Sequence, residues 1–245
     1  IASCLVGSEM CIRDRFKGFS YFTEMSDIIN RLEDHVASAR MKTTPVIDFE
    51  KNESLKGLDY LDTIYHAIVN EHPIQLKYRS FKARSANSFI FYPYLLKEYR
   101  NRWFVYGVRG NGRILQNLAL DRIQSLEVLP QEHYIKNTFF DPNTFFDDLV
   151  GVTKNSGSVA EKIGFKVAAA EAPYIITKPI HRSQQVVERL ADGSVILEIE
   201  VVINHELERV FFGYAEGIQV LYPKTLVELM GRKLKKAAEQ YTHSK

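Results

Sequence analysis

The spacing of hydrophobic residues changes along the chain from a helical period to a strand period. Between residues 16 and 72, apolar side chains recur every three or four positions, which predicts one helix over residues 16–40 and a second that Ser54 caps and that ends before Pro73. Between residues 74 and 129 the period shortens to two, which is typical of half-buried strands. The predicted strands cover residues 74–81, 88–95, 103–108, 113–120 and 123–129. Five short strands in so few residues indicate a small, strongly bent barrel.

Helices and strands alternate after a polar connection over residues 141–157. The predicted elements are a strand at 162–168, a helix at 173–177, strands at 184–189 and 194–202, a helix at 205–214, a strand at 218–222 and a last helix that begins at Pro223. The order β-α-β-β-α-β is that of a ferredoxin-like domain, so the predicted fold class is α+β.

The two patterns also divide the chain into segments. Residues 1–15 follow neither period, and we expect them to be a non-native or disordered leader. The other expected segments are a helical linker at residues 16–57, the β-barrel domain at 58–135 and the ferredoxin-like domain at 158–243.

Composition places the chain among globular proteins. It has 245 residues, of which 45% are hydrophobic and 25% charged, and no run approaches the roughly 20 apolar residues that span a bilayer. Its two cysteines, Cys4 and Cys11, support neither a disulfide framework nor a zinc site. We therefore expect a cytoplasmic protein that does not insert into a membrane.

The net charge of +2 hides an uneven distribution. The stretch from Leu76 to Ile123 holds ten basic and two acidic residues, a net charge of +8, so the rest of the chain carries −6. The same stretch contains ten aromatic residues. Phosphate groups form ion pairs with cationic side chains and bases stack on aromatic rings, so this composition favours a nucleic acid or nucleotide partner. The alternative is that the rings form the core of the domain and the cations merely solvate its surface.

Patterns typical of catalysis are weak in this sequence. Gly107, Gly110 and Gly112 lack the Lys-Ser/Thr pair of a phosphate-binding loop, and the seven histidines are scattered without ligand spacing. No paired-carboxylate or nucleophile-elbow context surrounds the acidic residues. We expect no catalytic residues, no metal and no cofactor.

Three segments in a fixed order, Tyr92–Leu95, Arg102–Gly107 and Leu120–Ile123, resemble the WYL domain of bacterial transcriptional regulators over about residues 58–130. The triplet that names that family reads Trp103-Phe104-Val105 here. The C-terminal part is similar to the extension that follows WYL domains in the same regulators. The segments that carry this second similarity are His181–Gln184, Asp192-Gly193 and Ile218–Pro223.

The resemblance implies an Sm- or SH3-like barrel that senses a nucleotide or a single-stranded nucleic acid and controls DNA binding by a winged helix-turn-helix in a homodimer. The ligand-binding residues that it implies are Tyr78, Ser80, Tyr92, Gln116 and Arg122. Tyr92 stands where the family often has His, and Gln116 where it has Arg; Arg102 and Arg113 are close enough in sequence to replace the missing cation. The possible secondary contacts are Arg79, Lys82, Arg84, His181 and Arg182. Trp103 is expected in the core, because central barrel strands bury their large rings.

Two questions remain open from the sequence. The segment His181–Gln184 either contacts a phosphate or simply builds a turn. The region ahead of the barrel has about one regular helix, too little for a winged helix-turn-helix, so we expect a regulator whose DNA-binding head has been truncated. The alternative function is a constitutive RNA- or single-stranded-DNA-binding barrel that never had such a domain. An enzyme such as a nucleotide phosphodiesterase is not supported, because the sequence shows no acid/base pair and no group of metal ligands.

Overall fold

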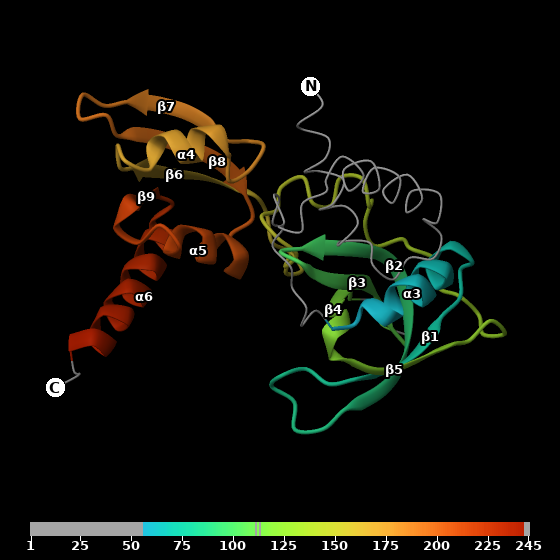
Figure 1. Ribbon diagram of the computed structural model, residues 1–245. Helices are drawn as coiled ribbons and strands as arrows, with labels where there is room; N and C mark the ends of the chain where they lie inside the picture. Colours follow the sequence, from blue (N-terminus) through green and yellow to red (C-terminus); the bar gives the residue numbers. More distant parts are fainter. Residues whose placement is uncertain (1–55, 111, 113, 243–245) are drawn as a thin grey trace, which may run out of the picture. The chain divides into compact units, whose positions relative to one another are not determined.

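The computed structural model describes residues 56–110, 112 and 114–242 (Figure 1). The chain forms two compact units, Ile1–Phe139 and Phe140–Lys245, which we describe separately. The predicted leader at residues 1–15, the predicted helix at 16–40 and the predicted helix cap Ser54 lie outside the described residues.

The first unit contains a five-stranded antiparallel sheet with the strand order β4-β3-β2-β1-β5. Its elements are η2 (Leu58–Tyr60), α3 (Leu61–Val69), β1 (Ile74–Tyr78), β2 (Asn87–Tyr99), β3 (Arg102–Arg109), β4 (Gln116–Ala119), η3 (Leu120–Arg122) and β5 (Ile123–Val128). All five predicted strands are present. Buried and more exposed residues alternate along β1, whereas β2 and β3 each bury four consecutive residues.

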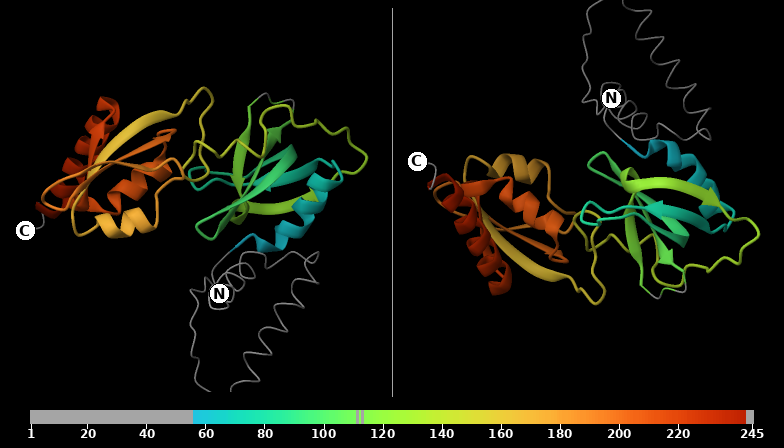
Figure 2. Two further views of the ribbon diagram at one scale, coloured as in Figure 1. Left: turned by 90° about the horizontal axis from the view of Figure 1, so that it is seen from above. Right: turned by 90° about the horizontal axis from the view of Figure 1, so that it is seen from below.

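Helix α3 packs on this sheet through one apolar face, as Figure 2 shows from two directions. Leu61, Ile64 and Ala67 recur every three residues along the helix and are fully buried. They join a cluster that includes Phe91 of β2 and Trp103 of β3. Trp103 is 8% exposed, which confirms its prediction as a core residue.

Gly107 allows β3 to pass close to β2. It lies opposite Pro93, where the register between the two strands shifts. A Cβ atom at Gly107 would lie 2.1 Å from the carbonyl oxygen of Tyr92 and 2.6 Å from the ring of Phe91. Only glycine therefore fits at this crossing.

The first strand is shorter than predicted. β1 ends at Tyr78, so Ser80 and Phe81 lie in the loop that leads to β2, and the predicted extension of the strand through Phe81 is wrong. The backbone turns here because Arg79 N donates to Arg122 O and Ala83 N donates to Ser80 O. β4 is also shorter than predicted, since it begins at Gln116.

The second unit contains a four-stranded antiparallel sheet with the order β7-β8-β6-β9. Its elements are β6 (Glu161–Val167), α4 (Ala172–Thr177), β7 (Gln185–Arg189), β8 (Val195–Val201), α5 (His205–Phe212), η4 (Ala215–Gly217), β9 (Ile218–Tyr222) and α6 (Lys224–Thr242). These elements confirm the predicted order β-α-β-β-α-β followed by a helix. With two antiparallel sheets and accompanying helices, the fold class is α+β.

A single apolar cluster holds the second unit together. Ile163, Phe165 and Val167 alternate along β6 and are fully buried, and they pack with residues of all three helices, α4, α5 and α6. None of the helices among the described residues combines the length and the apolar character that crossing a membrane requires.

Candidate ligand-binding site

Side chains from four segments of the first unit meet where β1 ends. Tyr78 is the last residue of β1, Phe81 lies in the following loop, Arg102 begins β3, and Asp121 and Arg122 belong to η3. We call these five residues the basic–aromatic cluster. It unites Tyr78, Arg102 and Arg122, three of the residues that the sequence predicted for ligand binding.

Arg122 stands at the centre of the basic–aromatic cluster. Its guanidinium carbon lies 4.5 Å from the centre of the Phe81 ring, within the range of a cation–π contact. The same guanidinium hydrogen-bonds the phenol of Tyr78. Burial raises the pKa of Tyr78, and the charge and hydrogen bond of Arg122 offset part of this effect. Arg122 is thus held between two rings.

Asp121 links the two arginines of the cluster. One carboxylate oxygen lies 3.2 Å from Nε of Arg102, and the other lies 3.8 Å from Nε of Arg122. The Asp121 side chain is 14% exposed, whereas that of Arg102 is 47% exposed. One carboxylate shared by two guanidinium groups leaves a net charge of +1 on these three side chains, so the cluster remains attractive to an anion.

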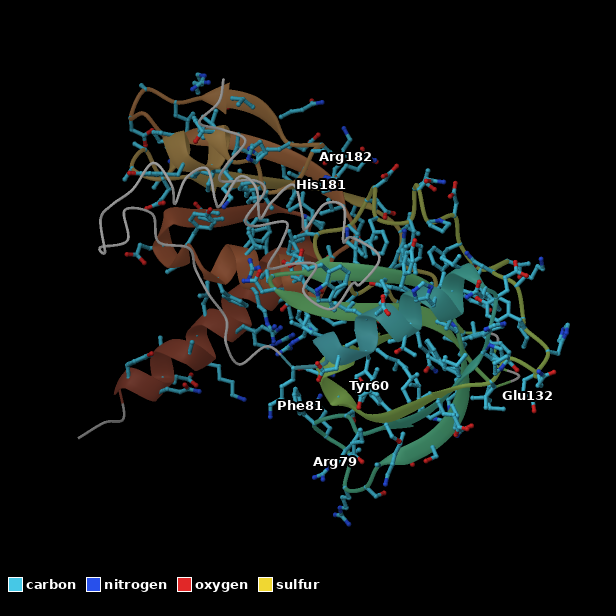
Figure 3. All side chains as sticks on the ribbon, turned by 45° about the vertical axis from the view of Figure 1, so that its right-hand side comes forward. Tyr60, Arg79, Phe81, Glu132, His181 and Arg182 are labelled. Carbon is cyan, nitrogen blue, oxygen red and sulfur yellow. The ribbon has the colours of Figure 1, made fainter. Side chains whose placement is uncertain are left out.

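The loop over residues 79–86 adds more positive charge beside the cluster. Arg79, Lys82 and Arg84 are exposed, and none of them forms an ion pair with a described residue. No acidic residue occurs between Lys77 and Lys97 in the sequence. Figure 3 shows Arg79 and Phe81 on this loop at the edge of the first unit. Ser80 is half-buried in the same loop.

Among the described residues, no hydrogen bond, ion pair or ring contact joins Tyr92 or Gln116 to this cluster. Tyr78 faces Asn87, which lies five residues before Tyr92 on β2. Tyr92 is 9% exposed, and its ring packs edge-on against Tyr134 with 6.0 Å between ring centres. Gln116 pairs with Gly107, which pairs with Pro93, so Gln116 lies at the same part of the sheet as Tyr92. Arg113 lies outside the described residues.

The segment His181–Gln184 builds a turn in the second unit. Ser183 N donates to Nδ1 of His181 at 3.2 Å, and Glu200 N donates to Oγ of Ser183 at 2.9 Å. Gln184 spans the turn, because its Oε1 accepts from Ile180 N at 2.9 Å and its Nε2 donates to Ile175 O at 3.0 Å. Of the two interpretations that the sequence left open, these bonds favour the turn.

His181 and Arg182 differ in the contacts that they already make within the second unit. Burial and the adjacent charge of Arg182 lower the pKa of His181, which favours the neutral imidazole that accepts a hydrogen bond. Nη2 of Arg182 lies 2.8 Å from a carboxylate oxygen of Asp147, although 64% of the arginine side chain is exposed. A phosphate contact at Arg182 would therefore compete with an existing ion pair.

Metal ligands and acidic side chains can be located in the part of the chain that the structure describes. No three His, Cys, Asp or Glu side chains gather there as metal ligands would. Asp147 and Asp148 pair with Arg182 and with Lys154 at 2.8 and 2.7 Å. These carboxylates serve as ionic partners within the second unit.

Two members of the basic–aromatic cluster were not among the predicted ligand-binding residues. Phe81 was assigned to a strand, although polar Ser80 at an inward position and the cations at 79, 82 and 84 are signals of an exposed loop. Asp121 is one of only two acidic residues in the basic stretch, and that rarity is the signal that could have found it.

Comparison with protein families assigns each unit of the chain. The WYL domain matches residues 59–128, which include the complete five-stranded sheet and the basic–aromatic cluster. The chain is therefore a WYL-domain protein. The WCX domain matches residues 160–238, so a WCX domain forms the greater part of the second unit.

Comparison with solved structures found similarity to two proteins over part of their chains. Proteasome accessory factor B/C (PafBC) of Arthrobacter aurescens is 15% identical, with a TM-score of 0.31, and the match covers 78% of this chain and 28% of that chain. A CRISPR Cas-related protein is 11% identical, with a TM-score of 0.45, and the match covers 76% of this chain and 52% of that one. The chain thus matches about a quarter and about half of their lengths. A search of curated proteins found no match.

Proposed function

We propose that this chain is the ligand-sensing part of a WYL-type transcriptional regulator and that its WYL domain binds a nucleotide or a single-stranded nucleic acid. The observation that carries this proposal is Arg122, held between Tyr78 and Phe81 beside a loop of exposed cations. A guanidinium fixed in this way is prepared for a phosphate, because little side-chain freedom remains to be lost on binding.

The primary contacts of the ligand are Tyr78, Ser80, Arg102 and Arg122, with Arg79, Lys82 and Arg84 as outer cations. Asp121 forms an ion pair with each of the two central arginines and leaves part of their charge uncompensated. Tyr92 is 9% exposed and packs against Tyr134, and no contact joins Gln116 to the cluster among the described residues, so we place both residues outside the primary contacts.

We also propose a fold type for each of the two domains. The edge strands β4 and β5 are consecutive and separated only by η3, which supports closure of the first sheet into an Sm- or SH3-like barrel. The strand order β7-β8-β6-β9 supports a ferredoxin-like WCX domain.

Regulation requires that the ligand prefer one arrangement of the domains. We propose that a homodimer reads duplex DNA through a separate DNA-binding domain and that the ligand shifts the equilibrium between its arrangements. The ligand can change DNA affinity only as far as its own affinity differs between the two states.

Fluorescence anisotropy with labelled single-stranded and duplex oligonucleotides across a salt series tests the proposed site. We expect single-strand binding that weakens with salt, with a log–log slope of about −0.7 per neutralised phosphate. Arg122→Gln is expected to weaken binding by about tenfold to a hundredfold, the loss of one charge-assisted hydrogen bond, and Arg122→Lys by less.

The matched control is Lys136→Gln in the same unit. Lys136 is a largely exposed cation that pairs with Glu71 at 3.0 Å, away from the cluster, and its removal is expected to leave binding unchanged. Equal losses in the Arg122 and Lys136 variants would point to unspecific attraction by net charge. Absence of binding of both oligonucleotides and free nucleotides at low salt would contradict the proposed function.

A further inference from the structure

Phe81 is exposed to a degree that packing does not explain. Its relative exposure is 75%, whereas five other aromatic side chains of the first unit, which contains the WYL domain and is called the WYL unit from here on, are less than 10% exposed. Those buried rings are Phe91, Tyr92, Tyr94, Trp103 and Tyr106. A phenylalanine left in water forgoes the stabilisation that burial of its ring provides, so the core of the unit does not account for this residue.

The position of the Phe81 ring is nevertheless defined. The guanidinium of Arg122 lies over the ring, and the same guanidinium is hydrogen-bonded to Tyr78 at the end of β1. The loop backbone is attached to η3 by the hydrogen bond from Arg79 N to Arg122 O at 3.1 Å. The ring is therefore presented to solvent from a supported loop.

The surroundings of the ring determine what it can receive. Arg79, Lys82 and Arg84 lie within three residues of Phe81, and no acidic residue occurs in this loop. An uncharged apolar partner would cover the ring but leave these cations without counter-charges. A nucleotide satisfies both, because its base stacks on the ring while its phosphate meets the cations.

We propose that Phe81 is a stacking platform for an unpaired base and that it selects single-stranded over duplex nucleic acid. This inference rests on the proposed function and names the chemistry that its site recognises. In a duplex the base faces are already stacked on their neighbours, so only a single strand or a free nucleotide offers a face to Phe81. Alanine substitution at such platforms weakens binding by about 1–3 kcal/mol per base, which corresponds to about 5- to 150-fold.

The test compares a labelled oligothymidylate with a strand of the same length that lacks bases, both bound to the full chain in anisotropy measurements. The wild-type chain is expected to bind oligothymidylate at least about fivefold more tightly than the abasic strand. Phe81→Ala is expected to abolish this preference, so that oligothymidylate and the abasic strand bind to the variant with the same affinity as each other. Phe81→Trp is expected to keep the preference.

Phe81→Trp also provides a direct signal of stacking. The chain has one tryptophan, Trp103, which is buried, so the indole at position 81 would report the exposed site. Its fluorescence is expected to be quenched by oligothymidylate and to remain unchanged with the abasic strand. Val69→Ala serves as the control, because Val69 is a 59% exposed apolar residue at the end of α3 and its removal is expected to change neither affinity.

The outcomes separate this inference from the function on which it rests. If the wild-type chain binds both strands equally, or if Phe81→Ala retains the preference, the stacking platform is wrong while a phosphate-binding site remains. If the free thymidine nucleotide binds the wild-type chain at low salt but neither strand does, the proposed selection of single strands is wrong. If neither the strands nor the nucleotide bind, the proposed function fails and the inference fails with it.

Discussion

Tyr94 is a buried tyrosine whose hydroxyl has no hydrogen-bond partner among the described residues. The residue is 7% exposed, and its ring is surrounded by Tyr134, at 6.1 Å and edge-on, and by Phe139, which stacks on it at 6.1 Å. Burial, with a smaller contribution from Tyr92, raises the pKa of Tyr94 to about 12. The ring therefore serves packing, and the hydroxyl is the unfavourable part of this side chain.

Tyr94→Phe is expected to raise the free energy of unfolding at pH 7 by up to about 1 kcal/mol, since it removes a desolvated hydroxyl without removing a hydrogen bond. Tyr134→Phe is the contrasting variant, because the Tyr134 hydroxyl donates to the carbonyl of Pro93, and it is expected to lower stability. Urea unfolding followed by the fluorescence of Trp103 measures both, since this tryptophan lies in the core of the WYL unit. Equal losses in the two variants would contradict the assignment.

Tyr94→Phe also changes how the free energy of unfolding depends on pH above 10. Between pH 10 and about 12 the unfolded chain loses the Tyr94 proton while the folded chain keeps it, so the stability of the wild-type chain falls as pH rises through this window. Tyr94→Phe removes this contribution, and its stability is expected to fall less steeply over the same range. An unchanged slope would mean that Tyr94 titrates normally in the folded chain.

At the scale of elements, Asn204 connects helix α5 to the segment that precedes the WCX sheet. Its Oδ1 accepts from Leu207 N at 2.9 Å and so caps the helix, while Nδ2 donates to the carbonyls of Val150 and Thr153, each at 2.9 Å. Asn204→Ala is expected to cost about 2–4 kcal/mol, since it removes a cap worth about 1 kcal/mol and leaves two carbonyls without a donor.

Asn204→Asp separates these two roles. The carboxylate retains the cap but cannot donate to Val150 O and Thr153 O, so this variant is expected to remain clearly less stable than the wild type. Urea unfolding followed by far-ultraviolet circular dichroism measures the loss, and the fluorescence of Trp103 records the WYL unit in the same sample. Wild-type stability in Asn204→Asp would show that the cap alone matters.

The elements themselves were largely predictable from the sequence. The pattern of apolar residues located β1 to β9 within a few residues, and Pro223 correctly marked the start of α6. The end of β1 was missed, because Arg79 and Ser80 continue the alternation of Lys77 and Tyr78 after the strand has ended at Tyr78. The loop begins there because a tertiary hydrogen bond from Arg79 N to Arg122 O replaces the ladder, and that bond has no local signature.

The candidate site was predictable only in part, for a related reason. The sequence motifs supplied Tyr78, Arg102 and Arg122, which the fold brings together. The places of Tyr92 and Gln116 in the sheet depend on the register of β1, β2, β3 and β4, which a strand pattern does not determine. Tyr92 is covered by Tyr134, a residue of the segment that follows β5 and lies beyond the predicted strands.

At the scale of the whole molecule, charge divides the WYL unit into two ends. The loop beside the basic–aromatic cluster carries only cations, whereas Glu71, Glu127 and Glu132 lie near the other end of β1, where Glu127 faces Gln75 and Leu129 N donates to Pro73 O. Figure 3 shows Glu132 on the opposite side of this unit from Phe81. Such a distribution orients an approaching polyanion toward the loop before any contact forms.

Hydrogen exchange of the full chain shows how far a bound ligand reaches beyond that loop. With saturating oligothymidylate, amides in residues 79–86 and in η3 are expected to exchange more slowly, because a ligand that binds the folded state makes local opening rarer. Residues 181–184 are expected to exchange unchanged, since Ser183 and Gln184 are already bonded within the turn and Arg182 is paired with Asp147. Slower exchange at residues 181–184 would contradict this expectation and would mean that the ligand contacts the WCX domain or changes it on binding. Unchanged exchange there, together with protection of the loop, would confine recognition to the WYL domain, so that any signal to a DNA-binding domain starts from β1, η3 and the loop between β1 and β2.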